Sequence, residues 1–225
     1  MATLLLRLAA PLQSWGEDSK FETRRTRREP TKSGVIGLLA AALGRRRDKP
    51  LDDLRSLRFA VRVDQEGELL RDFHTARNAK TAYVTERYYL ADAVFLAGLE
   101  SGDEEFLRSL DAALRAPAFP LFLGRRSCPP TPPLSLGVTP ELLEEALAAA
   151  PRQSSEWMRR FDGTGGASLR AVFDAPPGAC GAARLKDSPA SFDPRRRLYV
   201  YRPCEERLIS PEKQEQNDVQ GSQEP

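Results

Sequence analysis

The pattern of apolar and polar side chains predicts three strands before residue 100. Residues 3–9 alternate loosely, residues 57–64 alternate strictly, and residues 92–99 form a short apolar run. A period of two is typical of a strand with one buried face. The apolar face of the second strand would carry Leu57, Phe59, Val61 and Val63. Arg58 and Arg62 fall on its other face, so this strand is predicted to be half-buried.

A spacing of three and four between apolar residues predicts two helices. They cover residues 33–43 and about residues 106–114. Either Thr31 or Ser33 can cap the first helix, because a side-chain oxygen there can accept from free backbone N–H groups. Gly44 provides the expected stop after its last turn.

Residues 71–90 are polar and aromatic, and we predict that they form a projecting hairpin between the second and third strands. The order strand, helix, strand, hairpin, strand, helix favours an α+β fold with a ferredoxin-like (RRM-like) βαββαβ unit. We assign this unit to residues 1–120. Residues 121–210 are rich in proline and are expected to form a smaller strand-rich region. Residues 211–225 have the composition of a disordered tail.

The net charge of +2 conceals a local excess of basic residues before residue 50. Arginine supplies 28 of the 34 basic residues, and its guanidinium group forks onto phosphates and stacks on bases. The composition therefore favours a nucleic acid as partner. We predict that phosphates are held near the start of the first helix and at a later turn by Arg24, Arg25, Arg27, Arg28, Lys32, Ser33, Arg125 and Arg126.

Several other classes of protein are disfavoured. The three cysteines are odd in number and widely spaced, which argues against a disulfide framework and a structural zinc site. A nucleotide P-loop requires glycines at the positions of Thr26 and Thr31. The apolar run at residues 3–11 is interrupted by Arg7 and is too short to span a membrane, so we expect a cytoplasmic protein without membrane contact.

Six segments, in order within residues 3–137, resemble one known family. They read LLLRLAAPLQSWG, PTKSGVIGLLAAALGRRR, LRFAVRVDQ, LLRDFHTA, RYYLADAVFLAGL and FPLFLGRRSCPP. They look like the CasD subunits of type I-E CRISPR Cascade complexes, within the RAMP superfamily. The combination of PTKSG with LGRRSCP is specific, whereas after Gly137 little more than RRRLYVYR is similar.

This resemblance implies a non-catalytic subunit that binds the repeat-derived 5′ handle of the guide RNA (crRNA). Such a subunit caps one end of the complex and contacts the backbone subunit and the large subunit, without a cofactor or a small-molecule substrate. The resemblance also implies a ferredoxin-like domain with a thumb hairpin, here residues 71–90, which is shorter than in some relatives.

Recognition of single-stranded RNA requires aromatic and polar side chains that stack on bases or bind their edges. Aromatic residues in strands are also common core residues, so each candidate has a structural alternative. The candidates for these contacts are Gln13, Trp15, His74, Tyr83, Tyr88 and Tyr89.

Two alternatives remain open from the residues alone. His74, Tyr83 and Lys80 could supply the base, acid and cation of a metal-independent endoribonuclease that cleaves repeat RNA. The chain could also be an assembly protein without RNA contact. A metalloenzyme and a Ser-His-Asp or Cys-His hydrolase are disfavoured, because the chain has a single histidine and scattered acids.

Overall fold

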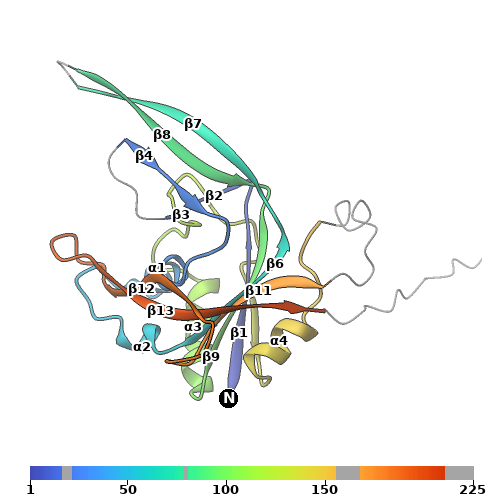
Figure 1. Cartoon of the computed structure of the whole chain (residues 1–225). Helices are drawn as coiled ribbons and strands as arrows, with labels where there is room; N and C mark the ends of the chain where they lie inside the picture. The colour runs from blue at the N-terminus through green and yellow to red at the C-terminus, as the bar shows by residue number, and fades with distance from the viewer. Residues whose placement is uncertain (17–21, 79–80, 156–167, 211–225) are drawn as a thin grey trace, which may run out of the picture.

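The computed structural model describes residues 1–16, 22–78, 81–155 and 168–210. Its centre is a seven-stranded sheet with the order β10-β1-β9-β6-β11-β13-β12 (Figure 1). The first half of the sheet comprises β1 (Ala2–Ala9), β6 (Arg58–Gln65), β9 (Val94–Ser101) and β10 (Ser135–Thr139). Neighbouring strands in this half are all antiparallel. The three strands predicted before residue 100 are therefore confirmed.

Two helices connect these strands and cover one face of the sheet. Helix α1 (Lys32–Ala42) follows β1, and α3 (Glu104–Arg115) follows β9. The Thr31 side chain caps α1 by accepting from the Gly34 N–H, and Gly44 after its end has a positive φ of 68°. Both predicted helix ends are confirmed, because Thr31 satisfies a free N–H and glycine adopts this φ without strain.

The C-terminal strands extend the same sheet. They are β11 (Leu169–Asp174), β12 (Ala183–Ser191) and β13 (Leu198–Ile209), and β11 pairs directly with β6. The division expected at residue 120 runs through this sheet, since β10 pairs with β1 on one side and β11 with β6 on the other. The regions 1–120 and 121–210 therefore share one sheet, and the predicted tail 211–225 lies outside the described residues.

Strand β6 differs from the half-buried strand that its alternation predicts. Short helix α4 (Leu143–Ala149) packs on the second face of the sheet, where Ala60 and Phe173 form part of a second apolar cluster. Arg62 on this face is fully buried. It pairs with Asp64 and donates to backbone carbonyls at the end of α4, so its charge is neutralised inside the protein. The prediction was wrong because the alternation does not reveal that a helix covers the arginine face.

A long hairpin of β7 (Glu68–Arg77) and β8 (Ala82–Ala91) extends away from the sheet (Figure 1). Four short strands pair at its base: β2 (Leu12–Gln13) and β4 (Thr23–Arg24) with β8, and β3 (Trp15–Gly16) with β5 (Thr26–Arg27). A one-turn helix, α2 (Asp52–Arg55), precedes β6. The hairpin strands thus cover the predicted segment 71–90 and continue slightly beyond it. Among the described residues, no helix has the length and apolar character needed to cross a lipid bilayer.

Candidate nucleic-acid interface

The start of α1 does not hold a free anion site in this structure. The backbone N–H of Lys32 donates to Asp187 Oδ2 at 3.0 Å, and the Gly34 N–H donates to the Thr31 side chain. A carboxylate therefore already lies where we expected a phosphate, and it interacts favourably with the positive end of the helix. The prediction of a phosphate at this helix end is corrected on this ground.

Lys32 belongs to a buried ion network rather than to an exposed basic surface. Its Nζ lies 2.7 Å from Asp174 Oδ2 and donates to the Leu57 carbonyl. Arg202 pairs with the same Asp174 at 2.6 Å and with Asp187 at 2.7 Å. We call these four residues, Lys32, Asp174, Asp187 and Arg202, the buried ion network.

The buried ion network is electrically balanced, with two cations and two carboxylates. Burial would lower the pKa of Arg202, but hydrogen bonds and charges of Asp187 and Asp174 outweigh burial and raise this pKa above its ordinary value. The network joins α1 to β11, β12 and β13 and so has a structural role.

Gln13 and Trp15 also lie in the interior instead of offering a surface to bases. Gln13 Nε2 donates to the carbonyls of Leu8 and Ala93, and the indole N–H of Trp15 donates to Gln13 Oε1 at 3.1 Å. The Trp15 ring packs so closely on Gly34 that a Cβ there would lie 2.8 Å from the ring. These buried contacts leave neither side chain open to a base, so both predicted base contacts are corrected.

A different group of basic residues gathers where the hairpin leaves the sheet. Arg24 on β4 is paired in register with Arg87 on the neighbouring β8. Arg125 donates from Nη2 to the Arg24 carbonyl at 2.9 Å, and its guanidinium group lies 4.5 Å from the centre of the Tyr89 ring. We call Arg24, Arg87, Tyr89 and Arg125 the hairpin-base cluster.

Within the described part of the chain, Arg24, Arg87 and Arg125 form no ion pair; Asp72, which lies opposite Arg87 in register, contacts His74 Nε2 instead. Arg87 Nε and Arg125 Nη1 are buried there without a hydrogen-bond partner. Burial would raise the pKa of Tyr89, but hydrogen bonding with Arg125 and Ser127 and the charge of Arg125 bring this pKa below its ordinary value. The cluster is thus a region of positive potential that stabilises an anion.

Comparison with known proteins assigns the family. A family model described as CRISPR-associated protein (Cas_Cas5) matches residues 3–205. The chain belongs to this Cas5 family. A curated relative, the CRISPR system Cascade subunit CasD of Escherichia coli (strain K12), is 40% identical over 156 residues, which cover 60% of this chain and 70% of the relative.

Two solved structures are similar over almost the whole Cas5-family chain. A structure described as a crystal structure of Cas protein is 41% identical with a TM-score of 0.71, covering 92% of this chain and 95% of the other. A chain of a CRISPR RNA-guided surveillance complex is 34% identical with a TM-score of 0.74, covering 93% of this chain and 90% of the other.

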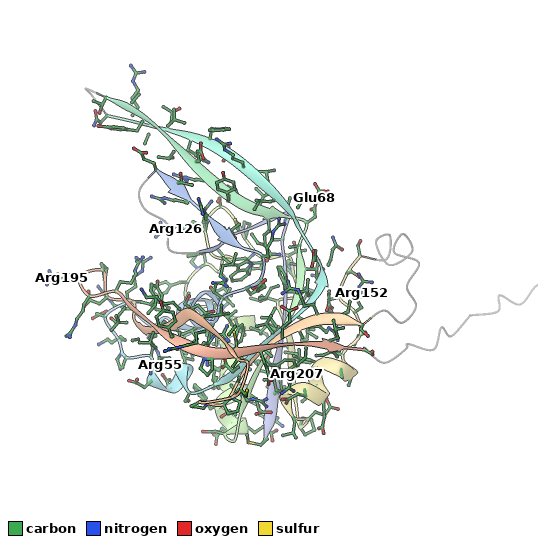
Figure 2. All side chains as sticks on the ribbon, viewed as in Figure 1. Arg55, Glu68, Arg126, Arg152, Arg195 and Arg207 are labelled. Carbon is green, nitrogen blue, oxygen red and sulfur yellow. The ribbon has the colours of Figure 1, made fainter. Side chains whose placement is uncertain are left out.

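Apart from Ser33 on α1, the remaining predicted residues of this Cas5-family chain lie around the hairpin and its base. Arg24, Arg25, Arg28 and Arg126 are exposed, whereas Arg27, Ser33 and Tyr88 are partly buried and Tyr89 is buried. Figure 2 shows Arg126 beside the base of the hairpin. Ser33 donates to the cap oxygen of Thr31, which gives it a structural partner. The structure therefore brings Arg24, Tyr89 and Arg125 together but separates Lys32 and Ser33 from them.

His74 and Tyr83 lie further out on the same face of the hairpin as Arg87. Cross-strand pairing places His74 opposite Thr85 and Ala76 opposite Tyr83, and Tyr83 is 56% exposed. His74 Nε2 lies in contact with the Asp72 carboxylate. Lys80 lies outside the described residues, so the structure describes only two members of the predicted ribonuclease group. Among the described residues, no three histidine, cysteine or acidic side chains converge as metal ligands.

Sequence reasoning missed Arg87, which was not among the predicted RNA contacts. A signal was available in the alternation of residues 83–89, which places Tyr83, Arg87 and Tyr89 on one face of a strand. Asp174 and Asp187 were missed for a different reason, since nothing near them in the chain indicates that they lie at the start of α1.

Proposed function

We propose that this chain is a non-catalytic subunit of a type I-E CRISPR RNA-guided surveillance complex and that it binds the 5′ handle of the guide RNA. The family match and the likeness to CasD and to a surveillance-complex chain support this role. The observation that carries RNA binding is the hairpin-base cluster, in which three arginines gather and form no ion pair with any described residue.

We infer that β1, α1, β6, β9, α3 and β10 form the ferredoxin-like domain of this family. Their order along the chain is βαββαβ, and the strand order β10-β1-β9-β6 supports the assignment because it is the order that this unit adopts. The β7–β8 hairpin, inserted between the second and third strands of the unit, is then the thumb.

The RNA backbone would follow the basic residues at the hairpin base. Arg24, Arg87 and Arg125 can each donate to phosphate oxygens, and Arg25, Arg27, Arg28 and Arg126 extend this basic surface along the chain. Tyr83 and His74 lie on the same hairpin face and could contact an unstacked base.

The opposite face of the hairpin is suited to a protein partner. Leu69, Phe73 and Val84 lie on this face and are 47%, 58% and 61% exposed. Because exposed apolar patches are typical of interaction sites, we propose that this face contacts the neighbouring backbone subunit of the complex. The large subunit would contact the same end of the assembly.

The test uses the purified chain, labelled RNA with the 5′ handle, and the same RNA with a shuffled handle. The double variant Arg24→Ala/Arg125→Ala should bind the handle RNA more weakly, and its dependence of log affinity on log salt should be shallower by about 1.4, since each phosphate contact on a single strand contributes about 0.7. Arg108→Ala/Arg115→Ala on α3 removes the same charge from exposed helical ion pairs and serves as control.

Equal affinity of the wild type for both RNAs, or an unchanged salt dependence in the double variant, would contradict the proposal. A denaturing gel of the same mixtures tests the ribonuclease alternative. A discrete cut that disappears in His74→Ala would make the chain an enzyme.

A further inference from the structure

A second basic surface lies away from the hairpin, where the segment after α1 meets the β12–β13 connection. Residues 45–49 and 193–197 together contain seven basic residues and two aspartates. A hollow of about 550 Å³ between them is lined by Arg46, Arg47, Asp48, Asp193, Pro194 and Arg195. We call this feature the arginine hollow; Figure 2 shows Arg195 at the end of the β12–β13 connection, away from Arg126.

The charges of the arginine hollow are mostly unbalanced. Arg45 donates to the Asp53 carboxylate from Nη1 and Nη2, and Arg46 Nε lies 3.7 Å from Asp48 Oδ1. In the described part of the chain, Arg47 and Arg195 form no ion pair, and the same holds for Lys49, Arg196 and Arg197. The basic residues at 45–47 lie beyond the last turn of α1 and those at 195–197 lie on another connection, so the helix dipole does not explain this concentration of charge.

The β12–β13 connection is held in place rather than free to move its charges apart. Asp193 organises the turn: its Oδ1 accepts from the Arg195 N–H at 2.8 Å and its carbonyl accepts from the Arg196 N–H. Phe192 packs edge-on against Tyr199 and against the apolar core that includes residues of α1. Like charges that are fixed close together repel each other, and a bound polyanion relieves this repulsion.

We propose that the arginine hollow is a second nucleic-acid site, which binds the phosphate backbone of a strand other than the 5′ handle. Arginine on both walls suits phosphate, because the guanidinium fork binds two phosphate oxygens at once. Of the six lining residues only Pro194 is apolar, whereas the core of a protein interface is enriched in apolar and aromatic side chains. The hollow therefore fits a nucleic-acid backbone better than an acidic protein surface.

The test measures binding of two labelled probes, a single-stranded oligonucleotide and a DNA duplex, each without a handle sequence, across a range of salt concentrations. Arg47→Ala/Arg195→Ala should weaken binding of at least one probe about tenfold and lower its salt slope by about 1.8 for duplex or about 1.4 for single strand, two contacts in each case. The two probes distinguish a duplex from a single strand as the source of the backbone.

Three variants keep this test separate from handle binding. Arg47→Lys/Arg195→Lys retains the charge and should keep most of the salt slope while losing part of the affinity. Arg24→Ala/Arg125→Ala should weaken binding of the handle RNA. When Arg47→Ala/Arg195→Ala is added to it, binding of the probes without a handle should fall by the same factor as in the wild-type background. Arg108→Ala/Arg115→Ala should change neither the binding of handle RNA nor that of the two probes. Thermal melts should show that all of these variants are folded.

Three results would overturn the proposal. One is unchanged affinity and salt slope for both probes in Arg47→Ala/Arg195→Ala. Another is a loss confined to the handle RNA, which would make the hollow a part of the first site. The third is competition by polyglutamate as effective as that of an oligonucleotide of equal charge, which would indicate an acidic protein partner.

Discussion

Two clusters of basic side chains in this chain differ in whether carboxylates accompany them. In the buried ion network, Lys32 and Arg202 share Asp174 and Asp187. In the hairpin-base cluster, Arg24, Arg87 and Arg125 gather without a carboxylate partner among the described residues. The same residue types thus stabilise the fold in one region and remain available to bind an anion in the other.

The comparison teaches that charge balance, and not the presence of arginine and lysine, separates a structural site from a binding site. A buried cation must be paired, because an unpaired charge in the interior is costly. Arg24 is exposed and Arg87 and Arg125 are only partly buried, so water can solvate much of their charge before an anion binds. The following predictions disturb each side of this comparison in turn.

Removing a carboxylate from the buried ion network should have the largest effect. Asp174→Ala leaves Lys32 and Arg202 without their shared partner and should lower the free energy of unfolding by about 3–5 kcal/mol. Urea unfolding measures this loss. Asp52→Ala, which removes a largely exposed aspartate on α2, is the control and should cost less than about 0.5 kcal/mol. Similar losses in both variants would show that the network is not a special structural site.

Gly34→Ala should lower the free energy of unfolding by about 1–3 kcal/mol, because the new Cβ would lie 2.8 Å from the Trp15 ring. Thermal or urea unfolding gives the value. Gly37→Ala on the same helix is a matched control, since its Cβ would be 3.7 Å from Phe192, an ordinary contact. Gly37→Ala should be neutral or stabilise by up to about 1 kcal/mol through helix propensity. If Gly34→Ala instead retained full stability and lost RNA affinity, this glycine would belong to the RNA site.

A carboxylate introduced at the hairpin base should make that cluster resemble the buried network. Ser127 lies in the turn that the Cys128 N–H closes by donating to the Arg125 carbonyl, and it helps to lower the pKa of Tyr89. Ser127→Asp should therefore lower the affinity for handle RNA about tenfold, since an intramolecular carboxylate competes with phosphate for guanidinium groups. Fluorescence anisotropy with labelled RNA measures the change, and the neutral Ser127→Asn is the control. Equal affinities of the two variants would argue against phosphate binding at this cluster.

The smallest expected effect concerns the ionisation of Tyr89. Its pKa in the folded protein lies below the unfolded value of about 10, because hydrogen bonding and the charge of Arg125 outweigh the effect of burial. Its contribution to stability is present above the unfolded pKa and is lost as pH falls through the folded pKa. Arg125→Ala should raise the Tyr89 pKa, whereas Arg126→Ala should leave it in place.

Ultraviolet absorbance of tyrosinate follows this titration, and subtraction of the Tyr89→Phe spectrum isolates the residue. An identical Tyr89 titration in the wild type and in Arg125→Ala would contradict the role given to the Arg125 charge.

The elements that local pattern determines were predicted well. Strict alternation in β6 and the apolar spacing in α1 located both elements, and the Thr31 cap and Gly44 stop follow from the chemistry of single residues. The resemblance to Cas subunits rested on whole segments in order, and the family match confirms it. Predictions that depended on the solvent exposure of a side chain succeeded less often, as Trp15, Gln13, Lys32 and Arg62 illustrate.

The sequence by itself determined the main strands, the two long helices and the hairpin before residue 120, that basic residues concentrate in a few segments, and to which family the chain is similar. Only the tertiary structure decided which basic residues face a carboxylate. Asp187 reaches the start of α1 from 155 residues away, and Arg125 meets Arg24 across 101 residues. Secondary structure follows from interactions between near neighbours in the chain, whereas charge pairing and burial depend on residues that only the fold brings together.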